Sequence, residues 1–125
     1  MERKTTFEVE VDAVRNIARL RYFGNVTAAD MKACVEQVEG ILPQMRAGFE
    51  ALVDLSGLES MELDCGPHIA RIMDLCKARG IRRSVRVIPD PSKDIGLNIL
   101  SLTHYRGEVQ TITCRTLAEA EQALK

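Results

Sequence analysis

The chain has 125 residues, of which 46% are hydrophobic and 28% charged, and its formal net charge is −1. This composition is typical of one folded domain and excludes wholesale disorder. The balanced charge and the few aromatic residues (two Tyr, three Phe and no Trp) also argue against a nucleic-acid-binding surface.

We expect a cytoplasmic protein that does not act at a membrane. The N-terminal sequence lacks the apolar segment of a signal peptide, and no run approaches the roughly 20 apolar residues of a membrane-spanning helix. The four cysteines, none of which forms a C-x-x-C pair, are Cys34, Cys65, Cys76 and Cys114. We therefore predict small apolar core thiols, with no metal site and no cofactor.

The chain opens with a predicted β-hairpin. Residues 6–11 alternate apolar and polar side chains, which indicates a half-buried strand. After a polar turn, residues 17–23 alternate again and suit an antiparallel partner. Gly24 and Asn25 are expected to end this second strand.

A helix and a buried strand are predicted next. Thr27 and Asp30 match a capping box, and the apolar residues between 31 and 45 keep helical spacing. Pro43 should stop or kink this helix. Residues 49–55 form a continuous apolar run, as in strands that are covered on both faces.

A second helix should begin at Gly66 and Pro67 and end at Gly80. Strands are then predicted within residues 81–88 and at 109–114.

Two more helices are expected in the C-terminal part. Ser92 is a candidate cap for one of them, whose apolar residues are Ile95, Ile99 and Leu102. The other follows a capping-box pattern from Thr116 to Glu119 and carries Leu117, Ala120 and Leu124.

The element order is therefore β-β-α-β-α-β-α-β-α. It predicts an α/β fold in which residues 1–125 form a single domain. Its sheet would be mixed, mostly parallel and five-stranded, with an N-terminal β-hairpin and about four helices.

The buried strand leads into Asp54-Leu55-Ser56-Gly57-Leu58. With the element order, this stretch resembles the STAS domain of bacterial anti-sigma factor antagonists. In that family the central strand ends in Asp-Leu-Ser, and a short loop leads to Asp-Ser-Ser-Gly at a helix start. The resemblance covers nearly the whole chain as element order, but only residues 54–66 at residue level. It implies a STAS-like fold and docking on a kinase-like anti-sigma factor, which phosphorylates a serine of that motif.

The phosphorylatable serine has no counterpart here. Aligning the glycines places Asp64 and Cys65 opposite the two serines, and without an inserted residue Leu63 and Asp64 fall there instead. Ser56 matches an upstream serine that is not the phosphoacceptor, and Ser60 lies in the predicted loop. Aspartate carries a charge of −1 and phosphoserine about −1.5 to −2, so Asp64 is at best a crude permanent mimic.

Residues at this junction allow more than one role. Asp64 could cap the first N–H groups of the helix, or it could be presented to a partner. Cys65 could have a lowered pKa at the helix N-terminus, with His68 one turn along as a base, or it could be a small buried residue.

Charge is segregated along the sequence. Residues 31–64 contain two basic and seven acidic side chains, whereas residues 71–86 contain six basic side chains and one acidic. Arg82 and Arg83 are expected to be exposed. Such segments can steer a charged partner or simply solvate the surface.

We predict a non-catalytic protein-interaction module whose partner is a kinase-like anti-sigma factor or a similar regulator. The expected partner-binding residues are Ser56, Asp64, Cys65, Gly66 and His68. One alternative is a domain that binds a small apolar or anionic ligand between sheet and helices. A less favoured alternative is a thiol-dependent enzyme that uses Cys65.

Overall fold

The computed structural model describes residues 5–90, 100 and 104–124. Its five-stranded sheet has the order β1-β2-β3-β4-β5. The strands are β1 (Phe7–Asp12), β2 (Ile17–Val26), β3 (Glu50–Met61), β4 (Arg83–Val87) and β5 (Gln110–Cys114). β1 and β2 pair antiparallel, and every other neighbouring pair is parallel. The predicted mixed sheet and N-terminal hairpin are confirmed.

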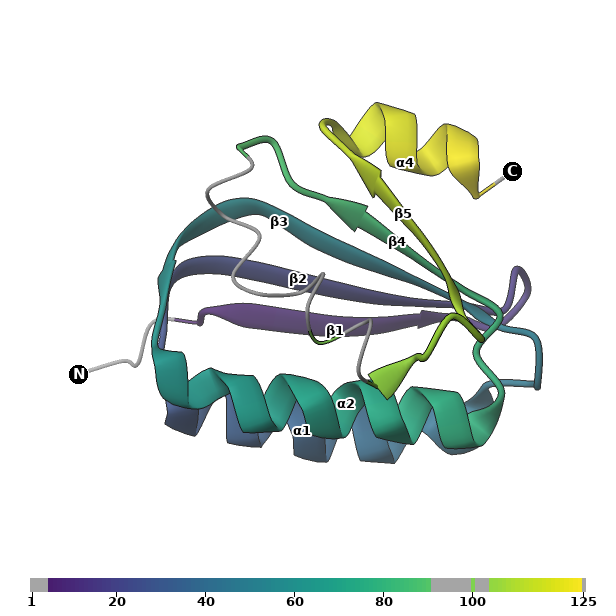
Figure 1. The fold of residues 1–125 in the computed structure, drawn as a ribbon, viewed down its shortest axis with the longest axis horizontal. Coiled ribbons are helices and arrows are strands. Elements are labelled where there is room, and N and C mark those ends of the chain that lie inside the picture. The colour runs from purple at the N-terminus through teal and green to yellow at the C-terminus, as the bar shows by residue number, and fades with distance from the viewer. Residues whose placement is uncertain (1–4, 91–99, 101–103, 125) are drawn as a thin grey trace.

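Helices cover both faces of the sheet (Figure 1). The helices α1 (Ala28–Ile41) and α2 (Gly66–Arg79) lie side by side on one face, and α4 (Leu117–Ala123) lies on the other. The described residues thus hold three α-helices rather than about four. The helix predicted after Ser92, with Ile95, Ile99 and Leu102, lies outside the described residues.

Local signals set the ends of α1. The Thr27 side chain accepts a hydrogen bond from the Asp30 N–H at 3.1 Å, and the Asp30 carboxylate accepts one from the Thr27 N–H at 3.0 Å. This is the predicted capping box, with Asp in place of the usual Glu. The helix ends at Ile41, and Pro43 lies in a 3-10 helix, Leu42–Gln44.

Strands β2 and β3 are longer than predicted. β2 continues through Gly24 and Asn25 because Gly24 adopts a φ of +68°, beside a shift in the register between β2 and β3. A Cβ on Gly57 would lie 3.0 Å from the Phe23 Cβ, so this glycine permits the strands to stay paired. The loop predicted after Leu55 is therefore wrong, because β3 runs on to Met61.

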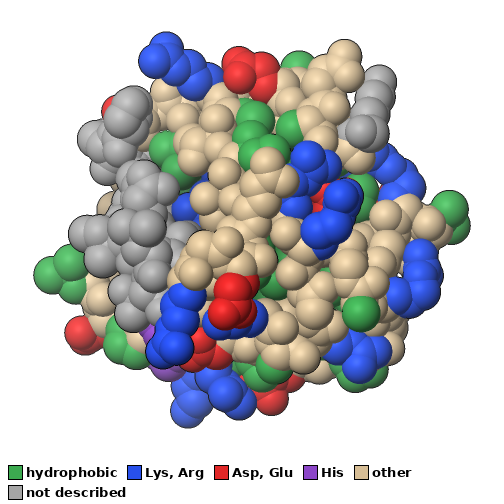
Figure 2. All heavy atoms as spheres, turned by 45° about the vertical axis from the view of Figure 1, so that its right-hand side comes forward, with side chains coloured by type: hydrophobic (Ala, Val, Ile, Leu, Met, Phe, Trp, Pro, Cys, Tyr) green, Lys and Arg blue, Asp and Glu red, His purple; other side chains and the backbone are tan. Residues whose placement is uncertain are grey.

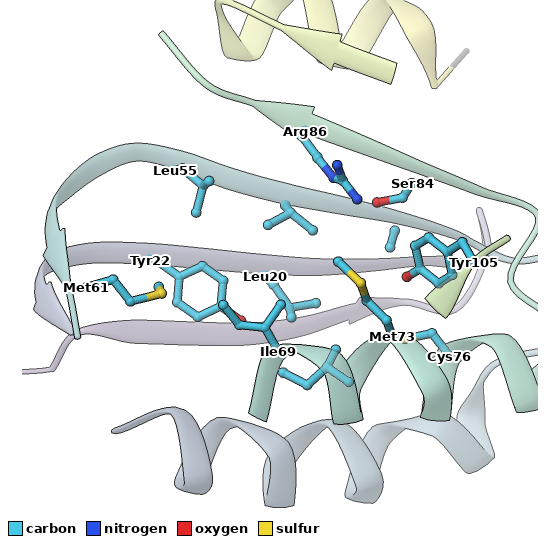
Figure 3. Close-up of a pocket in the computed structure, with 13 residues that line it drawn as sticks. Leu20, Tyr22, Leu55, Met61, Ile69, Met73, Cys76, Ser84, Arg86 and Tyr105 are labelled. Carbon is cyan, nitrogen blue, oxygen red and sulfur yellow. The ribbon is translucent and has the colours of Figure 1, made fainter. Parts of the chain in front are cut away.

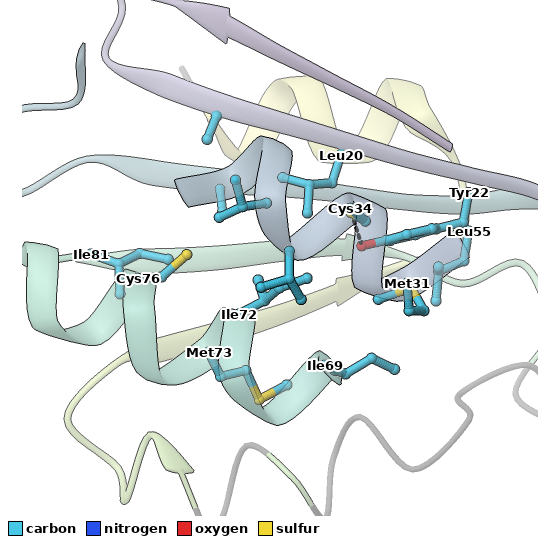
Figure 4. Packing of buried hydrophobic residues seen from close by; sticks show 14 of the residues in the cluster. Leu20, Tyr22, Met31, Cys34, Leu55, Ile69, Ile72, Met73, Cys76 and Ile81 are labelled. Atoms are coloured by element: carbon cyan, nitrogen blue, oxygen red, sulfur yellow. Dashed lines mark hydrogen bonds between the residues drawn. The ribbon is translucent and has the colours of Figure 1, made fainter. Parts of the chain in front are cut away.

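The main core lies between the sheet and the helices α1 and α2 (Figure 4). Tyr22 of β2 lies over α1, with its hydroxyl 3.3 Å from the Cys34 Sγ. All four cysteines are buried free thiols, as predicted. A smaller core beneath α4 includes Leu52, Val85 and Ala120, whereas Leu117 of the same helix is 45% exposed.

Candidate functional site

A tightly held turn joins β3 to α2. Only Glu62 separates β3 from a 3-10 helix, Leu63–Cys65, which leads directly into α2. The Glu62 N–H donates to the Val26 carbonyl at 3.0 Å, and the Cys65 N–H donates to the Glu62 carbonyl at 3.0 Å. The Glu62 carboxylate also accepts the Ala28 N–H at 2.7 Å. The turn is therefore tied to both β2 and α1.

We call residues 59–65 the acidic turn, because they include Glu59, Glu62 and Asp64 and no basic residue. Both Asp64 and Leu63 are exposed, and Leu63 is 97% accessible. Beside Leu63 lies a hollow of about 130 Å³, lined by Met61, Glu62, Leu63, Cys65, Gly66 and Ile69. The turn is thus open at the surface.

Asp64 does not cap α2, so the structural role considered for it is wrong. The N-cap position is Cys65, and no side chain caps the helix there. The 3-10 helix already uses the Cys65 and Gly66 N–H groups, which donate to the carbonyls of Glu62 and Leu63, and Pro67 has no N–H. Two of the first N–H groups of α2 are therefore already used or missing, and Asp64 is left exposed to solvent.

Cys65 lies beneath the turn. Its side chain is 1% exposed, and its Sγ donates to the Val26 carbonyl at 3.8 Å. Burial, and next the negative charge of Glu62, raise the pKa of the Cys65 thiol. A nucleophilic cysteine needs a lowered pKa, and no hydrogen bond between the described residues joins Cys65 to His68. The thiol-dependent alternative is not supported.

The remaining candidate residues do not form one cluster. Gly66 and His68 lie half-buried in the first turn of α2, beside Asp64. Ser56 is exposed but faces Asp54, whose Oδ1 accepts the Ser56 N–H at 2.9 Å and the Ser56 hydroxyl at 2.6 Å. Because Asp54 shares a surface hollow with Leu117 of α4, Ser56 belongs to the α4 face of the sheet.

The basic segment, residues 71–86, does not form a free surface patch. Arg82 and Arg83 both pair with Glu50, and Arg79 donates to the carbonyls of Met45 and Pro43. Arg86 is 1% exposed. Arg82 is exposed as expected, but Arg83 is only partly so. On the face shown in Figure 2, basic side chains are scattered, several of them beside acidic ones.

Arg86 lines an apolar pocket between the sheet and α2 (Figure 3). The pocket has a volume of about 50 Å³ and also contacts Met61, Ile69 and Tyr105. Burial raises the pKa of the Tyr105 hydroxyl. Sequence reasoning placed Arg86 in the basic segment and missed its burial. The sequence signal for this burial is the alternation of side chains along β4. Val85 and Val87 face α4, so Arg86, which lies between them, faces the opposite side of the sheet.

The described part of the chain shows neither a membrane-spanning helix nor a metal-binding cluster. None of its helices has the length and apolarity needed to cross a membrane. Residues 5–90, 100 and 104–124 also contain no group of three or more His, Cys, Asp or Glu side chains that could hold a metal ion.

No protein-family model and no curated protein matches the chain, but solved structures do. An uncharacterized protein from Shewanella loihica, of the DUF3478 family and with a SpoIIAA-like fold, matches with a TM-score of 0.70 and 12% identity over 100% of this chain and 98% of that one.

Two anti-sigma factor antagonists also match. Unphosphorylated SpoIIAA has a TM-score of 0.63 and 14% identity, over 94% of this chain and 96% of that one. An antagonist from Mycobacterium paratuberculosis has a TM-score of 0.57 and 17% identity, over 99% and 98%. The chain therefore has a STAS-like, SpoIIAA-like fold, the fold of anti-sigma factor antagonists.

Proposed function

We propose that this protein is a non-catalytic regulatory module that docks on a protein partner, a kinase-like anti-sigma factor or a similar regulator. The docking surface is the junction of β3 and α2, with Asp64, Gly66 and His68 in contact with the partner. Cys65 supports the turn from below, and Ser56, on the α4 face of the sheet, lies outside this surface.

The exposure of the acidic turn carries this proposal. Asp64 and Leu63 are held outward by a turn that is bound to β2 and α1, and neither side chain is needed to cap α2. A rigid surface loses little conformational entropy when a partner binds. The fold supports the proposal, because SpoIIAA, which shares it, is an anti-sigma factor antagonist.

We further propose that no phosphorylation switch operates at this turn. SpoIIAA is known in unphosphorylated and phosphorylated forms. In this chain the residues from Leu63 to Gly66 carry no hydroxyl group. Asp64 supplies a constant negative charge that is smaller than that of a phosphoserine. Docking should therefore not depend on a kinase reaction at this turn.

The test is to measure binding of the full chain to kinase-like anti-sigma factors of the same organism by calorimetry, with and without ATP. We expect wild type and Asp64→Ser to bind, with no effect of ATP on wild type. If neither protein binds while both remain folded, the docking function is wrong. If ATP releases wild type, the absence of a switch is wrong.

A second candidate function is binding of a small anionic ligand in the pocket beside Arg86. The observation that favours it is a buried guanidinium beside Ser84, in an otherwise mostly apolar wall to which Tyr105 also contributes (Figure 3). The pocket's 50 Å³ is far below the roughly 300 to 1,000 Å³ of most small-molecule sites, so only a compact ligand fits.

This candidate can be tested with butanoate and butan-1-ol as probes, which differ mainly in charge. Butanoate should raise the melting temperature more than the alcohol does, and Arg86→Met should remove the difference. Equal effects of the two compounds on wild type would rule out an anion site.

A further inference from the structure

We propose that Leu63 is the apolar anchor of the docking surface, and that it enters an apolar socket rimmed by Lys and Arg side chains on the partner protein. The inference rests on the proposed function and specifies the chemistry of the partner. The partner is a different protein, rather than a membrane or a second copy of this chain.

The exposure of Leu63 has no structural explanation within the described residues. A leucine that is 97% exposed contributes almost nothing to the core, and only two other large apolar side chains in the described part of the chain are exposed, Val14 and Leu117. The adjacent hollow of about 130 Å³ leaves room for a partner side chain between Leu63 and Ile69. An exposed apolar side chain beside an apolar hollow can pack closely against a complementary partner surface.

The turn that carries Leu63 is held in place before binding. The residues on both sides of Leu63 are held, because the Glu62 N–H and the Cys65 Sγ both donate to the Val26 carbonyl. The Glu62 carboxylate adds a third contact, to the Ala28 N–H. Because the turn is already ordered, insertion of Leu63 mainly costs the rotamer freedom of its side chain, so most of its burial contributes to affinity.

The charges around Leu63 select the partner. Glu62 and Asp64 flank it in the sequence, Asp64 is exposed, and the acidic turn contains no basic residue, so a positively charged rim is favoured. An anionic membrane would be repelled by the same carboxylates. In the basic segment of a second copy, Arg79, Arg82 and Arg83 are already bonded within the chain and Arg86 is buried, which leaves Arg71 as the exposed arginine of that segment for such a rim.

The test compares Leu63→Ala with Val14→Ala, using the full chain and a kinase-like anti-sigma factor that binds wild type. Val14 is 92% exposed in the turn between β1 and β2, at the opposite end of the sheet from the acidic turn, and is a matched control. We expect Leu63→Ala to weaken binding about 10- to 100-fold and Val14→Ala by less than about twofold. Asp64→Asn should weaken binding a few-fold at low salt and make it less salt-dependent.

The outcomes separate the inference from the function on which it rests. If wild type binds no such regulator, the proposed function fails and the inference falls with it. If wild type binds and both alanine variants bind equally well, only the anchor is wrong. A dimer of the chain alone, or binding to lipid vesicles, that is lost in Leu63→Ala would overturn the choice of partner.

Discussion

The acidic turn and the basic segment carry opposite charges, and the fold uses those charges in opposite ways. In the basic segment, residues 71–86, Arg82 and Arg83 neutralise Glu50 and Arg79 binds main-chain carbonyls. In the acidic turn Glu62 has such a role, as a partner of the α1 N-terminus, whereas Asp64 is exposed to solvent. Charge that is satisfied within the molecule stabilises the fold, and charge left at the surface is available to a partner.

The largest expected effect on stability comes from ionising thiols that are buried in the core, in contrast to the charges exposed at the acidic turn. Burial raises the pKa of Cys76, in the basic segment, to about 12 and that of Cys34 to about 11, from an ordinary value of 9.0. Above pH 9 the unfolded chain loses these protons while the folded chain retains them. The free energy of unfolding should therefore fall by a few kcal/mol between about pH 9 and pH 11.

This fall is measured by urea unfolding at a series of pH values. Cys76→Ala serves as the comparison, and its stability should depend less steeply on alkaline pH. If the stabilities of wild type and variant show the same pH dependence, buried thiol ionisation is not the cause.

The next effect concerns the ion pairs of the basic segment. Glu50→Gln should lower the free energy of unfolding by about 2 kcal/mol, because Arg83 is partly buried and loses its carboxylate. Asp64→Asn, in the acidic turn, should change it by less than about 0.5 kcal/mol. Both values come from urea unfolding, and equal losses would contradict the distinction between the two regions.

A smaller effect is expected at Arg79. Its Nε donates to the Met45 carbonyl at 3.0 Å and its Nη2 to the Pro43 carbonyl at 3.2 Å, which joins α2 to the segment after α1. Arg79→Met should cost about 1 kcal/mol of unfolding free energy. Arg71→Met, which changes an exposed residue of the same helix, is the control and should be nearly neutral. A loss at Arg71 as large as that at Arg79 would show that helix propensity or net charge is responsible.

Local sequence signals predicted most of the fold. The capping pair Thr27 and Asp30, the break near Pro43 and the end of α2 at Gly80 each depend on backbone chemistry within a few residues. Such signals can be recognised in the sequence without knowledge of distant contacts. The prediction that the second strand ends at Gly24 and Asn25 was wrong. Gly24 adopts a positive φ inside the paired strand, and β2 continues because its pairing with β3 continues.

The candidate site was less predictable because it depends on distant contacts. The exposure of Asp64 follows from hydrogen bonds that the 3-10 helix makes before α2 begins. The internal use of Arg82 and Arg83 follows from the position of Glu50 on the neighbouring strand. Residue type alone cannot reveal these partners, and it placed Ser56 beside Asp64 although Ser56 faces Asp54.

The most direct test is to map the docking surface by NMR on the isotope-labelled chain while a kinase-like anti-sigma factor is added. The largest changes in amide chemical shift should fall between Glu59 and His68, with Arg82, Arg83 and β5 unaffected. Changes centred on β5 and α4, with the signals of Leu63 and Asp64 unmoved in a formed complex, would contradict the assignment of the acidic turn as the contact surface.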